Sequence, residues 1–301
     1  SRNFANKIWN AARFILMNLE GHEIKNELPN ELTTEDKWII SSFNRVAKEI
    51  TENLEKFELG IAAQKIYDFL WDVFCDWYIE IAKIRMNSDD AQTAQNAREV
   101  LVWVMTGTLK LLHPFITEEI WQTLPHEGDA LIVAQWPEYR QEHDFPEAEL
   151  EMQRIMDVIR GVRNRRAEMN VPPSRKTNLY IATAEPNTFE NGISILNKLA
   201  YATQITIGQA FDIEGAVTIV TNDAKVYIPM DELVDKKAEL ARLNKELETA
   251  KKQFAQVNGK LNNQGFLSKA PAQVVEGVKK DFETLTERIQ LIESSISALQ
   301  S

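Results

Sequence analysis

The sequence predicts a mainly α-helical protein in three successive parts: a helical bundle, a small α/β unit and a C-terminal antiparallel coiled-coil hairpin. Apolar residues recur at spacings of three and four through most of the first part, as in amphipathic helices. Short runs rich in β-branched residues, with turn residues between them, occur in the second part. Two heptad seams of similar length fill the third. We therefore expect domains at residues 1–143, 144–230 and 231–301.

Four or five amphipathic helices with short connections are predicted for the first part, and such a set forms a bundle. The first helix carries Phe4, Ile8 and Ile15 on one apolar stripe, and Gly21 ends it. Thr33 to Asp36 form an N-cap cluster for the second. All seven tryptophans lie before residue 137, so this part is rich in aromatic residues. The predicted helices cover residues 3–19, 33 to about 56, 59 to about 81, 91–112 and 117–124.

The second part is predicted to mix helices and strands. It follows an irregular connector over residues 125–146, in which Leu131–Ala134 could form a short strand. Thr221 to Asp223 supply a hairpin turn between the last two strands, and Gly192 weakens the second helix. We expect helices over residues 146–170 and 186–199, and strands over residues 179–182, 205–207, 216–220 and 225–228.

The third part contains two heptad seams. The first runs from Leu240 to Leu261 and the second from Phe282 to Leu299. Asn262 to Gly265, followed by Ser268 to Pro271, cannot continue one helix, so the two seams are expected to fold back on each other. Each arm of about 26 residues would reach roughly 40 Å.

Several classes of protein are excluded or disfavoured. Cys75, the single cysteine, rules out an internal disulfide and a Cys-rich zinc site, and we expect it to be an inert core thiol in a reducing cytosol. The four histidines are scattered, so no metal site is expected. Glycine-rich phosphate loops and nucleophile motifs are absent, and hence no catalytic residue is assigned. No apolar run reaches the roughly 18 residues of a membrane helix, and the N-terminus does not resemble a signal peptide.

Charge is distributed unevenly, although the net charge of −11 argues against a generally basic nucleic-acid-binding protein. Residues 1–143 carry 14 basic and 23 acidic side chains, whereas residues 231–301 carry 11 of each. Residues 1–19 contain no acid. Their polar face could neutralise phosphates and bond to base edges, or it could be an ordinary solvated helix face. Its members, at helical spacing, are Arg2, Asn3, Asn6, Lys7, Asn10 and Arg13.

Two further basic groups stand out. Arg160, Arg163 and Arg166 follow one another at i, i+3 spacing, which suits phosphate contacts but equally suits cations near a helix C-terminus. The second group surrounds the predicted hairpin turn, where residues 249–275 contain four lysines and no acid. A long arm with a positive end suits contact with the phosphates of a nucleic acid, although a coiled coil that binds or dimerises with a partner protein is the alternative. These lysines, with two from the return arm, are Lys251, Lys252, Lys260, Lys269, Lys279 and Lys280.

The order of these features resembles a known family. SRNFANKIWNAARF at residues 1–14 closely resembles the first helix of the anticodon-binding domain in valyl- and isoleucyl-type tRNA synthetases, which are class I aminoacyl-tRNA synthetases. FCDWYIEIAK at 74–83 and LLHPFITEEIWQTL at 111–124 resemble further stretches of that domain. VIRGVRNRRAEMNVPPS at 158–174 and LNNQGFLSKAPAQVV at 261–275 are the specific matches, since they resemble the bacterial valyl type. The isoleucyl type usually ends in a Cys-rich zinc module, which one cysteine excludes.

The resemblance implies a tRNA-binding part of a cytoplasmic ligase that charges valine tRNA. The bundle would read the anticodon and the hairpin would pack against the outer corner of the tRNA. The resemblance also implies that ATP and magnesium are used elsewhere, because neither the His-x-Gly-His nor the Lys-Met-Ser-Lys-Ser signature of class I enzymes occurs in this sequence. We therefore expect a monomeric fragment without catalytic or editing domains, which holds no cofactor and binds tRNA weakly alone.

Overall fold

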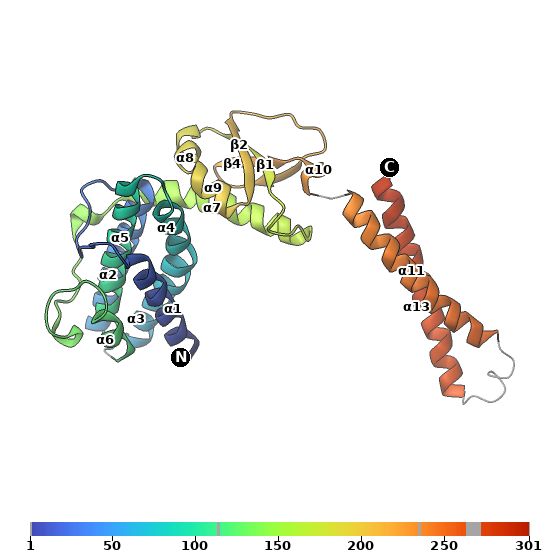
Figure 1. Ribbon diagram of the computed structural model, residues 1–301, viewed down its shortest axis with the longest axis horizontal. Helices are drawn as coiled ribbons and strands as arrows, with labels where there is room; N and C mark the ends of the chain where they lie inside the picture. The colour runs from blue at the N-terminus through green and yellow to red at the C-terminus, as the bar shows by residue number, and fades with distance from the viewer. Residues whose placement is uncertain (1, 113–114, 234–235, 263–271, 301) are drawn as a thin grey trace.

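The computed structural model describes residues 2–112, 115–233, 236–262 and 272–300. In that part of the chain the predicted mainly α-helical fold is confirmed, with a helical bundle, a small four-stranded sheet flanked by helices, and a long helical hairpin (Figure 1). The exact domain boundaries at residues 143/144 and 230/231 stay predictions.

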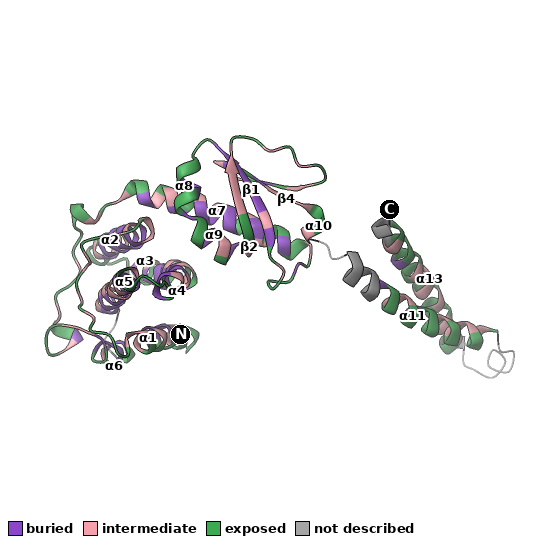
Figure 2. Ribbon diagram, turned by 45° about the horizontal axis from the view of Figure 1, so that its top comes forward, coloured by how far each residue is buried: buried purple, intermediate pink, exposed green. Residues whose placement is uncertain are grey.

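The predicted helices of the bundle are confirmed, with ends that differ by a few residues. They lie side by side, and their buried residues are turned toward one another (Figure 2). The end of α1 is set by Gly21, whose φ of +79° favours glycine. α5 begins after Asp90, whose carboxylate accepts hydrogen bonds from the backbone N–H groups of Gln92 and Thr93. The elements are α1 (Arg2–Leu19), α2 (Thr34–Glu55), α3 (Leu59–Asp68), η1 (Phe69–Tyr78), α4 (Ile79–Met86), α5 (Ala91–Lys110) and α6 (Ile116–Trp121).

The third predicted helix is one continuous helix with a π-helical centre. α3 leads into η1, which leads into α4 without a break in helical backbone angles. At the end of η1 the N–H of Ile79 donates to the carbonyl of Phe74, five residues earlier. Residues i and i+5 therefore lie above one another in η1, whereas an α-helix places i and i+4 together. This winding decides which side chains of η1 face α1.

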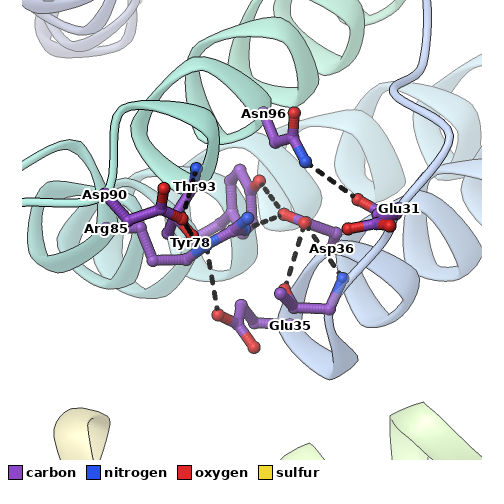
Figure 3. A network of polar contacts seen from close by, with 9 residues as sticks. Glu31, Glu35, Asp36, Tyr78, Arg85, Asp90, Thr93 and Asn96 are labelled. Atoms are coloured by element: carbon purple, nitrogen blue, oxygen red, sulfur yellow. Dashed lines mark hydrogen bonds and ion pairs between the residues drawn. The ribbon is translucent and has the colours of Figure 1, made fainter. Parts of the chain in front are cut away.

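A buried polar network centred on Asp36 connects α2 to η1 and α4 (Figure 3). Asp36 has no exposed surface, and one of its oxygens accepts hydrogen bonds from the phenol of Tyr78, at 2.8 Å, and from Arg85. Its other oxygen accepts from the backbone N–H of Thr33 at 3.2 Å, and the capping box so formed begins α2. Burial and the Asp36 carboxylate raise the pKa of Tyr78 well above its usual value, so the phenol keeps its proton and donates it.

The short strand that we considered at Leu131–Ala134, in the connector after α6, is not present in the structure, so that prediction is wrong. Residues Leu131–Val133 instead form the 3₁₀ turn η2. The N–H of Leu131 donates to the Glu118 carboxylate at 2.8 Å, so this backbone group is satisfied without a partner strand. Further along, Asn44 of α2 bonds to both backbone groups of Arg140, each at 2.8 Å, just before the turn η3 (Gln141–His143).

Helix α7 (Pro146–Glu168) joins the bundle to the sheet. At its start Glu149 accepts a hydrogen bond from Ser41 of α2 at 2.6 Å and pairs with Arg45. Further along, Gly161 allows α7 to pack closely against the sheet, because a Cβ at this position would come within 2.7 Å of the Ile219 side chain. Because α7 packs on both units, one hydrophobic cluster of described residues runs from the first helix of the bundle to Leu233.

The sheet has the order β2-β1-β4-β3, in which β1 and β2 are parallel and the other pairs antiparallel. The predicted helix between β1 and β2 is interrupted at Gly192, where a Cβ would lie 2.5 Å from Ile155 of α7. Phe211 covers the other face, against Tyr180 and Tyr227. The elements are β1 (Thr177–Thr183), α8 (Pro186–Asn191), α9 (Ile193–Leu199), β2 (Ala202–Gly208), β3 (Val217–Val220), β4 (Ala224–Ile228) and the short α10 (Met230–Leu233), which was not predicted.

The hairpin, called the arm below, consists of α11 (Lys236–Leu261) and α13 (Ala272–Gln300). Its helices pack against each other, which confirms the predicted coiled coil. Leu243, Ala250 and Ile292 are buried along the seam, and the rings of Phe254 and Phe282 lie 4.8 Å apart. Because the two seams cover each other within one chain, the arm gives no support to the alternative of a dimerisation module. The predicted break at residues 263–271 lies outside the described residues.

We predict that Asp36→Ala destabilises the bundle by about 3 kcal/mol, because it leaves the buried Arg85 charge with only the Glu35 carboxylate, 3.5 Å away, and removes the acceptor of the Tyr78 hydroxyl. Urea unfolding followed by tryptophan fluorescence measures this, since all seven tryptophans precede residue 137. Asp90→Ala is the matched control, because it removes an exposed N-cap carboxylate and should cost less. Equal losses in the two variants would contradict a central role for the Asp36 network.

Candidate nucleic-acid interface

One face of α1 is polar and points to solvent, as the sequence predicts. The opposite face is held by Ile8, Ala11, Ala12 and Ile15, all buried in the bundle, so the polar face is presented on a fixed helix. Five of the six predicted contact residues are exposed on it: Arg2, Asn3, Asn6, Asn10 and Arg13. Cationic and amide side chains on one rigid face can bond to phosphates and to base edges.

Lys7, the sixth predicted contact residue, lies at the edge of this face and is already engaged. Its ammonium group forms an ion pair with Asp76 of η1 at 2.6 Å and lies 4.2 Å from the centre of the Trp71 ring. Trp71 and Asp76 are five residues apart, and the π-helical winding of η1 turns both toward α1. Lys7 therefore fastens α1 to η1, a role that spacing along α1 alone does not indicate.

Aromatic rings lie beside the polar face and were missed as site residues. Phe4 of α1 stacks on Tyr67 at 5.0 Å, and Tyr67 stacks on Trp71 at 5.5 Å. On the helix itself Trp9 and Met17 are also substantially exposed. The i, i+4 spacing of Tyr67 and Trp71 is a signal that could have been read from the sequence, but their meeting with Phe4 depends on the packing of α1.

All three arginines of the predicted cluster on α7 make contacts, but they differ in exposure: Arg160 is exposed, Arg163 half-buried and Arg166 buried. Arg160 pairs with Asp157 at 3.1 Å and lies over the Trp77 ring. Arg163 donates to the backbone carbonyl of Leu199 at 2.7 Å. These contacts hold α7 against η1 and the end of α9, and leave Arg160 as the member best placed for a phosphate.

Arg166 is buried, which corrects the expectation of a phosphate contact there. It is 3% exposed and donates hydrogen bonds to the hydroxyl of Thr177 and the carbonyls of Pro172 and Arg175. Burial lowers the pKa of its guanidinium group. Arg166 thus ties the loop after α7 to β1, and i, i+3 spacing could not reveal this because it does not report which face of α7 is covered.

The arm presents lysines along both helices, and five of the six predicted contact lysines lie in the described residues and are exposed. Ion pairs cross the hairpin, Lys251 with Glu293 at 2.7 Å and Arg288 with Glu246 at 2.8 Å. From residue 249 to the end of α11 there is no acid, so the positive charge rises toward the turn. The other exposed members are Lys252, Lys260, Lys279 and Lys280, and Lys269 lies outside the described residues.

In the described ranges, no group of three or more His, Cys, Asp or Glu side chains could hold a metal ion. A cavity of about 250 Å³ lies between α2, α5 and the connector, where Trp103, Trp136 and His143 line it. Burial lowers the pKa of His143, so the ring is neutral at pH 7, and it lies edge-on to Trp103 at 5.4 Å. These contacts hold the connector in place.

Two stretches of the chain match known domain families. Residues 36–181 match the anticodon-binding domain of tRNA ligases, and residues 235–300 match the tRNA-binding arm of valyl-tRNA synthetases. The first match extends from α2 across the bundle and α7 into β1, and the second covers the arm. None of the described helices combines the length and apolar character needed to cross a membrane.

Relatives cover the whole chain but are much longer. The valine–tRNA ligase of Clostridium acetobutylicum is 43% identical over 100% of this chain and 35% of its own length. Those of Listeria monocytogenes and Bacillus subtilis are 42% and 38% identical, over 97% and 96% of this chain. Each of these two matches covers 34% of the relative. The chain thus spans about a third of the length of the curated relatives it matches.

We predict that Cys75 is unreactive in the folded protein. Burial raises the pKa of its thiol to about 12 from 9.0, so the thiolate fraction at pH 8 falls by about a thousandfold. Reaction with a chromogenic disulfide reagent should be slow in buffer and fast in urea, where the thiol is exposed. Rapid reaction of the folded protein would contradict the inert-thiol prediction.

Proposed function

Residues 36–181 belong to the anticodon-binding domain family of the tRNA ligases and residues 235–300 to the valyl-tRNA synthetase arm family, and from this we propose that the chain is the tRNA-binding part of a valine–tRNA ligase. The observation that carries the proposal is the presence of both domains in one chain, in the order of ligases that match it along its whole length. The basic faces of α1 and the arm supply a physical means of binding tRNA.

The exposed face of α1 contacts the anticodon in this proposal. Asn3, Asn6 and Asn10 offer amide groups that can pair with base edges, while Arg2 and Arg13 can neutralise phosphates. The bases of an RNA loop can be splayed out and read individually, which a paired stem does not allow. A rigid helix that presents three amides between two cations fits such a loop better than it fits a base-paired stem.

The arm contacts the outer corner of the tRNA through charge. Lys252, Lys260, Lys279 and Lys280 are exposed, and a lysine ammonium group binds phosphate as a point charge without reading sequence. Lys251 is partly neutralised by Glu293 and contributes less. The arm therefore adds affinity, whereas discrimination between tRNAs depends on α1.

We infer that activation of valine with ATP and magnesium, and its transfer to tRNA, are carried out by another part of the ligase. This inference is supported by the absence of the class I signatures from the sequence, and by the chain spanning about a third of the length of the ligases that it matches. In this proposal the protein acts in the cytoplasm, where tRNA is charged. It acts as a monomer, which is supported by the heptad seams that cover each other within one chain.

The proposal is tested by competition between valine tRNA and isoleucine tRNA for the full chain, measured across salt concentrations. We expect preference for valine tRNA and weaker binding of both as salt rises, because phosphate contacts release counterions. The net charge of −11 should keep the absolute affinity low. Absent, equal or salt-insensitive binding of the two tRNAs would overturn the proposal.

Replacing the arm lysines should weaken binding of every tRNA alike. For Lys260→Ala we expect the slope of log affinity against log salt to fall by about 1, because one phosphate contact is lost. Lys225→Ala is the matched control, since this exposed lysine lies on β4, away from the arm. A change in discrimination between tRNAs, with an unchanged slope, would contradict a purely electrostatic role.

A further inference from the structure

Three aromatic rings form a continuous stack on the surface where α1 meets α3 and η1. The rings of Phe4 and Tyr67 lie 5.0 Å apart with 28° between their planes, and those of Tyr67 and Trp71 lie 5.5 Å apart at 13°. The ammonium group of Lys7 lies 4.2 Å from the centre of the Trp71 ring. We call Phe4, Tyr67 and Trp71 the stack below.

Tyr67 and Trp71 are set apart from the bundle core. Their helix buries Ile66, Phe69 and Leu70 in the core, each 6% exposed or less, whereas Tyr67 is 37% exposed. Neither Tyr67 nor Trp71 belongs to the core cluster of described residues. Tyr67 is exposed and Trp71 is half-buried, and a ring pair outside the core that remains partly in contact with water points to a role at the surface.

The stack is held in place by its neighbours. Lys7 pairs with Asp76 at 2.6 Å, so the cation over Trp71 is fixed by an ion pair as well as by the ring. The π-helical winding of η1 allows this, because it brings Trp71 and Asp76 to one side of the helix. Rigid rings lose little conformational entropy when a further ring stacks on them.

Charge around the stack favours a base over a phosphate. Asp68 and Asp72 are exposed directly after Tyr67 and Trp71, and their negative charge repels a phosphate. A carboxylate can, however, accept a hydrogen bond from the amino group of a base. At the Phe4 end, Arg2 and Asn3 are exposed and can hold the backbone that carries the base.

We propose that the stack of Phe4, Tyr67 and Trp71 is a platform on which an unpaired base of the anticodon loop stacks. The inference rests on the proposed function and adds a second kind of contact to the polar face of α1. Every base has a π-face, so stacking supplies affinity without sequence preference. The amides of α1 then discriminate among bases that the platform holds beside them.

The test uses the full chain and two RNA probes: a stem–loop with the valine anticodon, and the same stem extended into a closed duplex. We expect Tyr67→Ala to weaken binding of the stem–loop by about 10-fold and Tyr67→Phe to bind like the unaltered protein, because only the ring is needed. Duplex binding should be weak and unchanged. The matched control is Tyr139→Ala, since Tyr139 is 40% exposed in the same unit but lies outside the stack.

A fluorescent adenine analogue placed in the loop gives a second readout. Its emission should be quenched on binding to the unaltered chain, because it stacks on a ring, and recover with Tyr67→Ala. Circular dichroism confirms that each variant is folded, and the quenching measured on the unaltered chain does not depend on any variant. Unquenched emission at every loop position would overturn the proposal.

Binding of whole valine tRNA separates the two proposals. If the unaltered chain does not bind whole tRNA, the proposed function fails. If whole tRNA binds but the stem–loop does not, or if Tyr67→Ala binds the stem–loop as well as the unaltered chain does, only the stacking platform is overturned.

Discussion

The carboxylate of Asp36 is the contact on which the bundle depends. It is fully buried, begins α2 through a capping box, and accepts hydrogen bonds from Tyr78 of η1 and Arg85 of α4. Two segments distant in sequence, α2 and the continuous helix that contains η1 and α4, are thereby fixed at one point (Figure 3). A buried ion pair adds little net stability, but its geometry admits few alternatives, and breaking it leaves a buried charge.

The position of η1 in turn shapes the surface beside α1. Its π-helical winding directs Trp71 and Asp76 to Lys7, and α3 brings Tyr67 to Phe4. The polar face of α1 is thus bordered by rings on a rigid support, whereas the arm offers exposed lysines along two helices. The two surfaces suit different tasks, because hydrogen bonds and stacking depend on fixed geometry while attraction to phosphates acts over a Debye length. An acidic protein can therefore bind a polyanion at limited places.

Sequence reasoning predicted much of the fold, because local signals and tertiary packing agree in most elements. The stripe of α1, the cap at Thr33 and the break at Gly192 all lie where periodicity and residue type placed them. It failed at Leu131–Ala134, where β-branched residues are exposed and a distant carboxylate satisfies the backbone. A run of β-branched residues forms a strand only if a neighbouring strand is available.

The sequence by itself determined the order of the helices, the heptad seams of the arm, and the separation of basic stretches from an acidic remainder, since these are properties of spacing and composition. Only the tertiary structure decided which cations are available. Arg166 is buried beneath the loop after α7, and Lys7 is bound by η1, while Arg160 and the α1 amides remain exposed. The stacking of Phe4 on Tyr67 and of Tyr67 on Trp71 likewise depends on the tertiary structure, because it requires α1 to pack beside α3 and η1. The physical reason is that periodicity shows which residues share a face of a helix, whereas burial and contacts depend on what packs against that face.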